Sequence, residues 1–215
     1  MTGAKTQLGA QVVPLQRMPP GYESDAELGA ALIRGEAAAA HVAWKRYAPM
    51  VRRIIKRTLG PGYDVDDYAQ EAFLRFFTMV PSLEEPKALR SFLVTVTTNV
   101  VRDALKYRWV RRIMQPLGPG VSEKAARAHD PSEREALGRF YKILDRLSAD
   151  DRTAYVLRFI EEMDLIEVAE ALGCSLATVK RRLLAVHKRV FKMVERDPAL
   201  VEYLTTRNDR SPDAS

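Results

Sequence analysis

The segment from Leu165 to Arg189 constrains the fold of this chain more than any other part. It has the pattern of a helix, a glycine turn and a second, basic helix. Ala169 is small enough to let the two helices cross closely. Gly173 can adopt the left-handed conformation that ends a helix, and Ser175 is a natural N-cap for the next one. Together these residues predict a helix-turn-helix.

The second helix of this motif is expected to have an apolar face and a basic face. The apolar residues recur at three- and four-residue steps and should be buried: Leu176, Val179, Leu183, Val186 and Val190. The opposite face should carry Ala177, Arg181, Leu184 and Lys188, with Lys180 on its flank. Such a helix fits the major groove of DNA. The alternative is an ordinary amphipathic helix whose basic face is only solvated.

Charge is distributed unevenly along the 215 residues, whose formal net charge is +6. Between Cys174 and Arg196 there are seven Lys or Arg residues and one acid, whereas between Asp145 and Glu170 there are eight acids and three arginines. An acidic stretch followed by a basic helix creates a segregated electrostatic field, which can steer a polyanion. The modest total charge indicates a chain that binds DNA together with another partner.

Several other classes of site are not expected. Cys174 is the only cysteine, and the three histidines, His41, His129 and His187, form no ligand pair, so we predict no disulfide, metal site or cofactor. No acid–base pair, activated nucleophile or phosphate loop points to an enzyme. The absence of a signal peptide and of a long apolar run argues against membrane insertion and favours a reducing cytoplasm.

The chain is predicted to be all-α, with two small helical domains joined by a flexible linker. Ser24 and Glu27 form a capping box that opens the first helix, and prolines and glycines after Ile113 exclude a continuous helix there. The expected divisions are a disordered segment 1–23, a helical domain 24–112, a linker 113–132, a second helical domain 133–196 and a polar tail 197–215, which is expected to be loose from Thr205.

Within the first domain, helical patterning is interrupted at Gly60-Pro61-Gly62 and around Pro81 to Pro86. The β-branched run Val94 to Val101 is ambiguous between strand and helix. We interpret it as a helix because Phe92, Val96 and Val100 keep helical spacing.

The first domain also carries a second signal, in two parts. Asp66 and Asp67 open a predicted helix whose sequence is DDYAQEAFLRFF, and they complement the helix dipole. Downstream, Tyr107 and Trp109 are interleaved with cations at the end of another helix. Cations follow phosphates and aromatic rings stack on bases, so this composition favours single-stranded DNA. The alternative is a helix end whose cations favour its dipole, with Trp109 in the core.

Taken together, these motifs resemble the extracytoplasmic-function (ECF) group of bacterial RNA polymerase sigma factors, over roughly residues 25–196. AWKRYAPMVRRI (43–54) resembles the opening helix of the family. DDYAQEAFLRFF (66–77) resembles region 2.2, which in the family grips a coiled coil of the polymerase β′ subunit. RSFLVTVTTNVVRDALKYRW (90–109) resembles regions 2.3 and 2.4, which melt and hold the −10 promoter element. LSADDRTAYVLRFIEEMDLIEVAEALGCSLATVKRRL (147–183) resembles region 4, whose second helix reads the −35 element.

The resemblance implies three sets of site residues. Those that match the polymerase-binding edge are Asp67, Gln70, Glu71 and Leu74. Those assigned to the −10 element, where a flipped base is captured, are Leu83, Ala88, Asn99, Lys106, Arg108, Trp109, Arg111 and Arg112. Those assigned to the −35 element are Ser175, Thr178, Lys180, Arg181, Arg182, Leu184 and Lys188.

The partners implied are core RNA polymerase, through its β′ coiled coil and its β subunit, and promoter DNA. An anti-sigma factor is a further implied partner, because family members are commonly held inactive by one. The resemblance implies a bacterial, cytoplasmic protein that is associated with the nucleoid when active, and that uses the polymerase for chemistry rather than being an enzyme itself.

The chain departs from the family pattern at several positions. Phe92 stands where a tryptophan is usual and Thr97 where an alanine is usual, and both look like packing changes. Ala185-Val186-His187 lacks the cations common in the family, which implies weaker or differently centred −35 binding. Arg181 replaces a small serine, which implies a shifted promoter preference.

Two other functions are compatible with parts of the sequence. A stand-alone helix-turn-helix regulator would bind operator DNA as a dimer, but it has no need of the DDYAQEAF motif, and no sustained heptad supplies a dimer interface. A degenerate relative would bind only proteins, and its activity would survive charge reversal at Lys180 and Arg181. The sequence favours a two-domain sigma factor over both.

Overall fold

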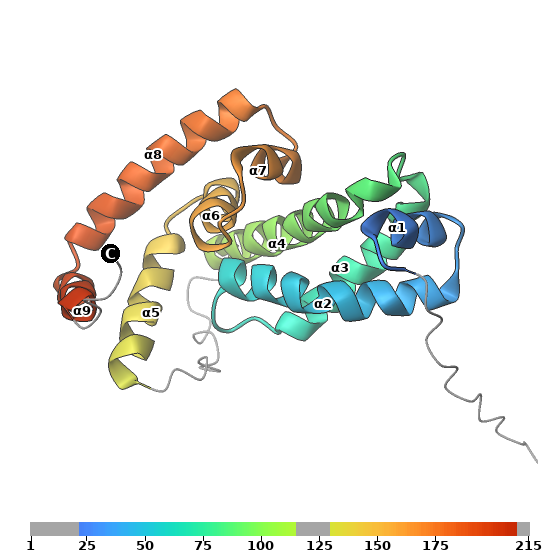
Figure 1. The fold of residues 1–215 in the computed structure, drawn as a ribbon. Helices are drawn as coiled ribbons and strands as arrows, with labels where there is room; N and C mark the ends of the chain where they lie inside the picture. Colours follow the sequence, from blue (N-terminus) through green and yellow to red (C-terminus); the bar gives the residue numbers. More distant parts are fainter. Residues whose placement is uncertain (1–21, 115–129, 210–215) are drawn as a thin grey trace, which may run out of the picture.

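In the computed structural model, residues 22–114 and 130–209 are described, with side chains at 22–110 and 130–207, and every regular element in these ranges is a helix (Figure 1). The all-α prediction is therefore confirmed. Most of the segment expected to be disordered, 1–21, and most of the expected linker, 115–129, lie outside the described residues.

The N-terminal half contains four α-helices and two short 3₁₀ turns. These are α1 (Asp25–Ile33), α2 (Ala37–Leu59), α3 (Val65–Met79), η1 (Val80–Ser82), η2 (Pro86–Ala88) and α4 (Leu89–Met114). The capping box of Ser24 and Glu27 is present, and α2 ends before Gly60, whose φ is +79°. The ambiguous run from Val94 to Val101 is helical, because it lies inside α4.

An aromatic core holds α2, α3 and α4 together. Phe73 and Phe76 of α3 are buried, and the ring centroid of Phe73 lies 4.5 Å from that of Trp44 on α2. Phe92, in the place of the usual tryptophan, lies 6.0 Å from Phe76. Thr97 is buried and donates its hydroxyl to the carbonyl of Leu93, 2.8 Å away on the same helix. The core thus accommodates both departures.

The C-terminal half consists of helices that place a helix-turn-helix at its outer edge. They are α5 (Pro131–Leu144), α6 (Ala149–Tyr155), the π-helical turn η3 (Val156–Ile160), α7 (Leu165–Leu172), α8 (Leu176–Glu195) and α9 (Pro198–Asp209). Gly173 has φ 63°, in the left-handed region, and the Ser175 hydroxyl accepts from the N–H of Thr178 at 3.2 Å. The helix-turn-helix prediction is confirmed.

The predicted buried face of α8 is correct except at its first residue. Val179, Leu183, Val186 and Val190 are buried, whereas the side chain of Leu176 is 38 % exposed. A helical side chain lies over the turn that precedes its own Cα, and at the first position of α8 no such turn exists.

The prediction of a polar tail from residue 197, loose from Thr205, is wrong as far as residue 209, because Pro198–Asp209 forms α9. Proline is favoured at the first position of a helix, and the Asp197 carboxylate accepts from the N–H of Leu200 at 3.3 Å. Leu200 is buried in a small core with residues of α5 and α8, and this burial stabilises the helix. Residues 210–215 lie outside the described residues.

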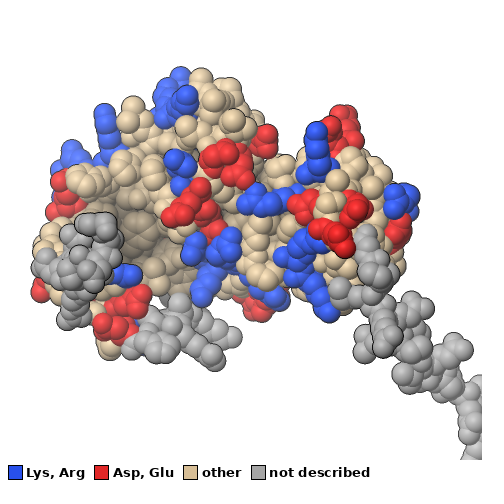
Figure 2. Space-filling model, in the orientation of Figure 1, with Lys and Arg blue, Asp and Glu red and all other residues tan. Residues whose placement is uncertain are grey.

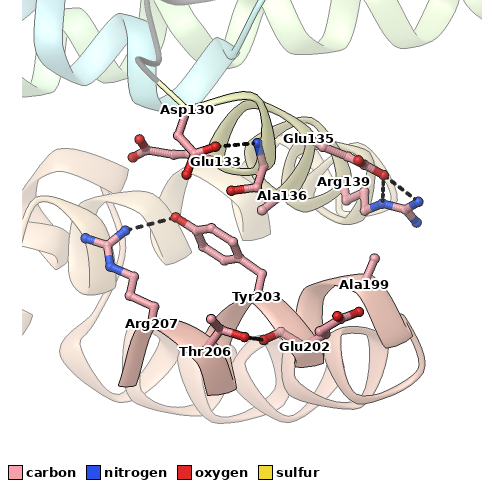
Figure 3. Close-up of a pocket in the computed structure, with 11 residues that line it drawn as sticks. Asp130, Glu133, Glu135, Ala136, Arg139, Ala199, Glu202, Tyr203, Thr206 and Arg207 are labelled. Carbon is pink, nitrogen blue, oxygen red and sulfur yellow. Dashed lines mark hydrogen bonds and ion pairs between the residues drawn. The ribbon is translucent and has the colours of Figure 1, made fainter. Parts of the chain in front are cut away.

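A cavity of about 580 Å³ lies between α5 and α9 (Figure 3). Its arginines are engaged by neighbouring groups: Arg139 pairs with Glu135 at 2.9 Å and with Asp197 at 3.3 Å, and Arg207 donates to the Tyr203 hydroxyl at 3.2 Å. The Arg139–Asp197 pair ties the start of α9 to α5, while the other two contacts lie within one helix each.

The two halves pack directly on each other, with α4 between α2 and α3 on one side and α6 and α7 on the other (Figure 1). Ile54 of α2 and Val94 of α4 are buried in one apolar cluster with Leu157 and Val168 of the C-terminal half. The contact between the two halves therefore has an apolar centre, and burial of these side chains stabilises the contact through the hydrophobic effect.

Replacing Gly29 by alanine is expected to destabilise the protein by about 1–3 kcal/mol, as overpacking does. A Cβ at this position of α1 would lie 2.3 Å from the carbonyl oxygen of Pro86, so the helix and the turn η2 would have to separate. Urea unfolding followed by circular dichroism measures the change.

Gly138→Ala is the matched control, because nothing lies within 4 Å of a Cβ built at this helical glycine of α5. It is expected to stabilise the protein by about 0.5–1 kcal/mol, since alanine loses less backbone entropy in a helix. Equal effects of the two substitutions would contradict the close approach of α1 to Pro86.

Candidate nucleic-acid and protein interfaces

An acidic edge with an exposed leucine runs along α3. The carboxylate of Asp64 caps this helix, accepting from the N–H groups of Asp66 at 3.0 Å and Asp67 at 3.3 Å. Asp67 and Gln70 are exposed, and the side chain of Leu74, one turn after Gln70, is 57 % exposed. An apolar side chain beside acids on a rigid helix suits docking to a protein.

Glu71, the fourth residue predicted for this edge, is engaged within the N-terminal half. Its carboxylate lies 2.6 Å from Arg75, which also reaches Asp103 of α4 at 2.9 Å. These two carboxylates raise the pKa of Arg75. The Arg75–Asp103 pair ties α3 to α4, and Glu71 pairs with Arg75 within α3 while its side chain stays 46% exposed.

The end of α4 exposes one lysine and two aromatic residues and turns one arginine inward. Lys106, Tyr107 and Trp109 are exposed, Trp109 to 65 %, so the alternative that placed Trp109 in the core is wrong. Arg108 turns inward, with its guanidinium 5.2 Å from the ring centre of Tyr63 and 3.7 Å from the Asp145 carboxylate. The side chains of Arg111 and Arg112 lie outside the described residues.

The residues predicted to hold a flipped base come from α4 and from the turns that precede it. Asn99 is exposed on α4, where its oxygen accepts from Arg102 at 3.4 Å. Leu83 and Ala88 are half-buried in the turns before this helix. Asn99 follows Leu89, the first residue of α4, by ten positions, or about 15 Å along the helix axis.

The outer face of α8 is cationic. Lys180, Arg181, Leu184 and Lys188 are all exposed there, as predicted. Neither Lys180 nor Arg181 pairs with a carboxylate within the described part of the chain. Unpaired cations beside an exposed apolar side chain, on a helix with a capped N-terminus, are available to a phosphate backbone and to base edges.

Three other residues predicted to contact DNA on α8 have partners inside the protein. The guanidinium of Arg182 pairs with Asp150 at 3.2 Å and with Asp151 at 3.7 Å. The Ser175 hydroxyl caps α8 and lies 2.9 Å from the hydroxyl of Thr178. These side chains therefore cap α8 and hold it against α6.

Asp150 is a residue of this surface that the sequence analysis did not identify. It lies on α6 and pairs with Arg102 of α4 at 2.7 Å as well as with Arg182 of α8. Burial by itself would raise the pKa of this carboxyl, but the two arginines outweigh burial and lower it. Its ionised form therefore links the two helices predicted to read DNA. In the sequence, the acidic stretch from Asp145 to Glu170 was the signal that could have identified this residue.

No helix in residues 22–114 or 130–209 has the length and apolar character needed to cross a membrane. The same part of the chain contains no group of three or more His, Cys, Asp or Glu side chains that could hold a metal ion.

The two halves match two models of one protein family. Residues 43–111 match Sigma-70 region 2, and residues 137–186 match Sigma-70 region 4. The chain belongs to the sigma-70 family, in its extracytoplasmic-function group. It is therefore a promoter-specific sigma factor that binds core RNA polymerase, and the stand-alone regulator is not favoured.

Curated relatives cover much of the chain. The ECF RNA polymerase sigma factor SigM of Mycobacterium tuberculosis is 26% identical over 171 residues, which are 80% of this chain and 85% of SigM. SigE of Mycolicibacterium smegmatis is 30% identical over 65% of this chain and 55% of its own length. SigW of Bacillus subtilis is 24% identical over 64% of this chain and 79% of its own length.

Two solved structures share the fold. CnrH, in complex with the cytosolic domain of CnrY, aligns with a TM-score of 0.61 at 22% identity, covering 80% of this chain and 98% of CnrH. The sigma factor RpoE, in complex with the anti-sigma factor NepR from Bartonella quintana, aligns with a TM-score of 0.55 at 20% identity, covering 73% and 97%.

Substituting Ser175 separates its role as a helix cap from any contact with DNA. Ser175→Ala is expected to lower the free energy of unfolding of the C-terminal half by about 1 kcal/mol, because an N–H at the start of α8 loses its acceptor. Thermal unfolding followed by circular dichroism measures this loss.

Ser175→Asp is the matched variant, since aspartate is as good an N-cap as serine. It should retain the stability of the parent and yet bind duplex DNA more weakly, because it adds a negative charge beside the cationic face. If alanine and aspartate destabilise the protein equally, the hydroxyl does not act as the cap.

Proposed function

We propose that three separate surfaces of this sigma factor each bind a different partner. The edge of α3 binds core polymerase, the aromatic end of α4 binds the single-stranded −10 element, and the outer face of α8 reads the −35 element. The observation that carries the proposal is the face of α8: Lys180 and Arg181 are exposed, without a carboxylate partner in the described residues, on a capped helix of a helix-turn-helix.

For the −10 element, the composition of the end of α4 supports the assignment. Tyr107 and Trp109 present open ring faces on which unpaired bases can stack, and Lys106 is placed to neutralise a phosphate. Asn99, further back on the same helix, offers an amide to a base that has left the stack. Taking a base out of the duplex costs a few kcal/mol, and such contacts offset that cost.

We further infer that the polymerase supplies all the chemistry, and that the protein acts in the cytoplasm, at the nucleoid when active. An anti-sigma factor is the partner expected to hold it inactive. The support for this partner is that the RpoE structure that shares its fold is a complex with the anti-sigma factor NepR.

Combining Asp67→Lys with Leu74→Arg is expected to weaken binding of core polymerase at least about tenfold, because it removes an apolar anchor and reverses a charge at the centre of the proposed edge. Titrating fluorescently labelled variant with core enzyme gives the affinity, and run-off transcription from promoter fragments gives the activity. Both side chains are exposed, so the fold should be retained.

Glu84→Lys is the control for this pair, because Glu84 is an exposed acid of the same half, outside the edge. It should bind the polymerase as the parent does. An unchanged affinity of the double variant would remove the α3 edge from the interface.

Lys180→Ala with Arg181→Ala is expected to weaken binding to promoter duplex at least about tenfold while binding of core polymerase is kept. Each lost phosphate contact should also reduce the slope of log affinity against log salt by about 0.9. Fluorescence anisotropy at several salt concentrations measures both quantities. Lys192→Ala, an exposed lysine near the other end of α8, should change neither, and a loss as large as that of the double variant would place the DNA elsewhere.

A further inference from the structure

A cavity of about 820 Å³ lies where the end of α4 meets the turn between α5 and α6. Its volume is in the range of pockets that bind small organic molecules. The wall combines cations, carboxylates and one tryptophan, and a residue of α8 also reaches it. The side chains of this wall that can carry charge or stack on a ring include Lys106, Trp109, Asp145, Arg146, Asp150 and Arg189.

The two carboxylates of this wall are already engaged by arginines. Asp145 and Asp150 each lie within ion-pair distance of two guanidinium groups. The partners are Arg108 and Arg152 for Asp145, and Arg102 and Arg182 for Asp150. The negative charge of the wall is therefore compensated by side chains other than the remaining cations of the cavity.

Three cations of the wall have no carboxylate partner within the described part of the chain. Lys106, Arg146 and Arg189 are all exposed. The guanidinium of Arg189 donates to the backbone carbonyl of Arg146 at 2.9 Å, which brings α8 against the turn between α5 and α6. Figure 2 shows basic and acidic side chains intermixed across the middle of the molecule, so three unpaired cations around one cavity are a local surplus. Such a surplus attracts an anion.

Trp109 gives the same cavity an aromatic wall. Its exposed side chain lines the cavity together with the apolar side chains of Leu105 and Leu147. An exposed indole can stack on a planar ring, and nucleic-acid bases are rings of this kind. The cavity therefore offers a stacking surface and unpaired cations to one ligand.

We propose that this cavity binds a free nucleoside polyphosphate, with its base on Trp109 and its phosphates on Arg146, Arg189 and Lys106. A guanidinium can donate two parallel hydrogen bonds to a phosphate, and an ammonium adds a compact positive charge. The ligand thus meets both chemical features of the wall. The proposed function needs no small-molecule ligand, so this site goes beyond it.

A free nucleotide fits the cavity better than a nucleotide within a DNA strand. A nucleoside polyphosphate concentrates several negative charges on one short chain of phosphates, whereas a strand carries one charge per nucleotide. Three unpaired cations around one cavity match the concentrated charge. Trp109 and Lys106 are also assigned to the −10 strand, so a bound nucleotide competes with that strand for both, a consequence that rests on the proposed function.

Quenching of tryptophan fluorescence by ATP measures binding at this cavity. Trp44 is the only other tryptophan of the chain, so a Trp44→Phe background leaves Trp109 as the single reporter. ATP is expected to quench it saturably, with one site per chain. In calorimetric titrations, adenosine, which lacks phosphates, and inorganic triphosphate, which lacks a ring, should each bind at least about tenfold more weakly than ATP.

Combining Arg146→Ala with Arg189→Ala is expected to weaken ATP binding at least about tenfold, because the phosphates lose two guanidinium partners. Both side chains are exposed, so the fold should be retained. Lys192→Ala with Arg196→Ala is the matched control, since it removes two exposed cations at the end of α8 that do not line the cavity. It should bind ATP as the parent does.

Two results would overturn the proposal. One is the absence of any ATP-dependent change in Trp109 fluorescence at parental helicity. The other is an equal loss of affinity in the two double variants, which would show only a general attraction of polyanions.

A short single-stranded oligonucleotide separates the free nucleotide from the strand. It is expected to quench Trp109 equally in the parent and in the Arg146→Ala/Arg189→Ala variant, because its contacts lie on α4. Dependence of the oligonucleotide, and not of ATP, on the two arginines would assign the cavity to the strand and refute the proposal. Run-off transcription with core polymerase reports the proposed function separately, since it can succeed whether or not the free protein binds ATP.

Discussion

The arrangement of the two halves of this protein depends on the hydrogen bonds and the ion pair made by the guanidinium of Arg152. It lies at the point where the carbonyl end of α2 meets α6, and it donates to Thr58 and Leu59 of the other half while pairing with Asp145 of its own. Burying such a charge is costly unless every donor finds an acceptor, and here carbonyls and a carboxylate supply them. The position of the C-terminal half on α2 follows from this fit.

Pairing between the halves also determines which charged side chains are exposed on the surface. Asp145, Asp150, Glu161 and Glu167 pair with arginines of the N-terminal half, whereas Lys180 and Arg181 on the outer face of α8 have no carboxylate partner among the described residues. Part of the acidic stretch is therefore paired internally, while Glu162, Asp164 and Glu170 stay exposed. The cationic face of α8 and the aromatic end of α4 are exposed as well.

Local features were predictable because they depend on neighbours in the sequence. The capping box at Ser24, the left-handed Gly173 and the cap at Ser175 each follow from one or two residues and the backbone groups beside them. The predictions that failed depend on distant packing. The helix after Pro198 was not predicted, and it forms where Leu200 meets α5 and α8.

The candidate site shows the same division. The exposed face at Arg181 and Leu184 could be predicted from periodicity, but the inward turns of Arg108 toward Tyr63 and of Arg182 toward α6 could not, because both partners lie far away in the chain. The sequence by itself determined the all-α class, the caps at Ser24 and Ser175, the helix-turn-helix and the family. Only the tertiary structure decided which charges are exposed and which face the other half, because pairing of charges between the halves depends on how folded surfaces meet.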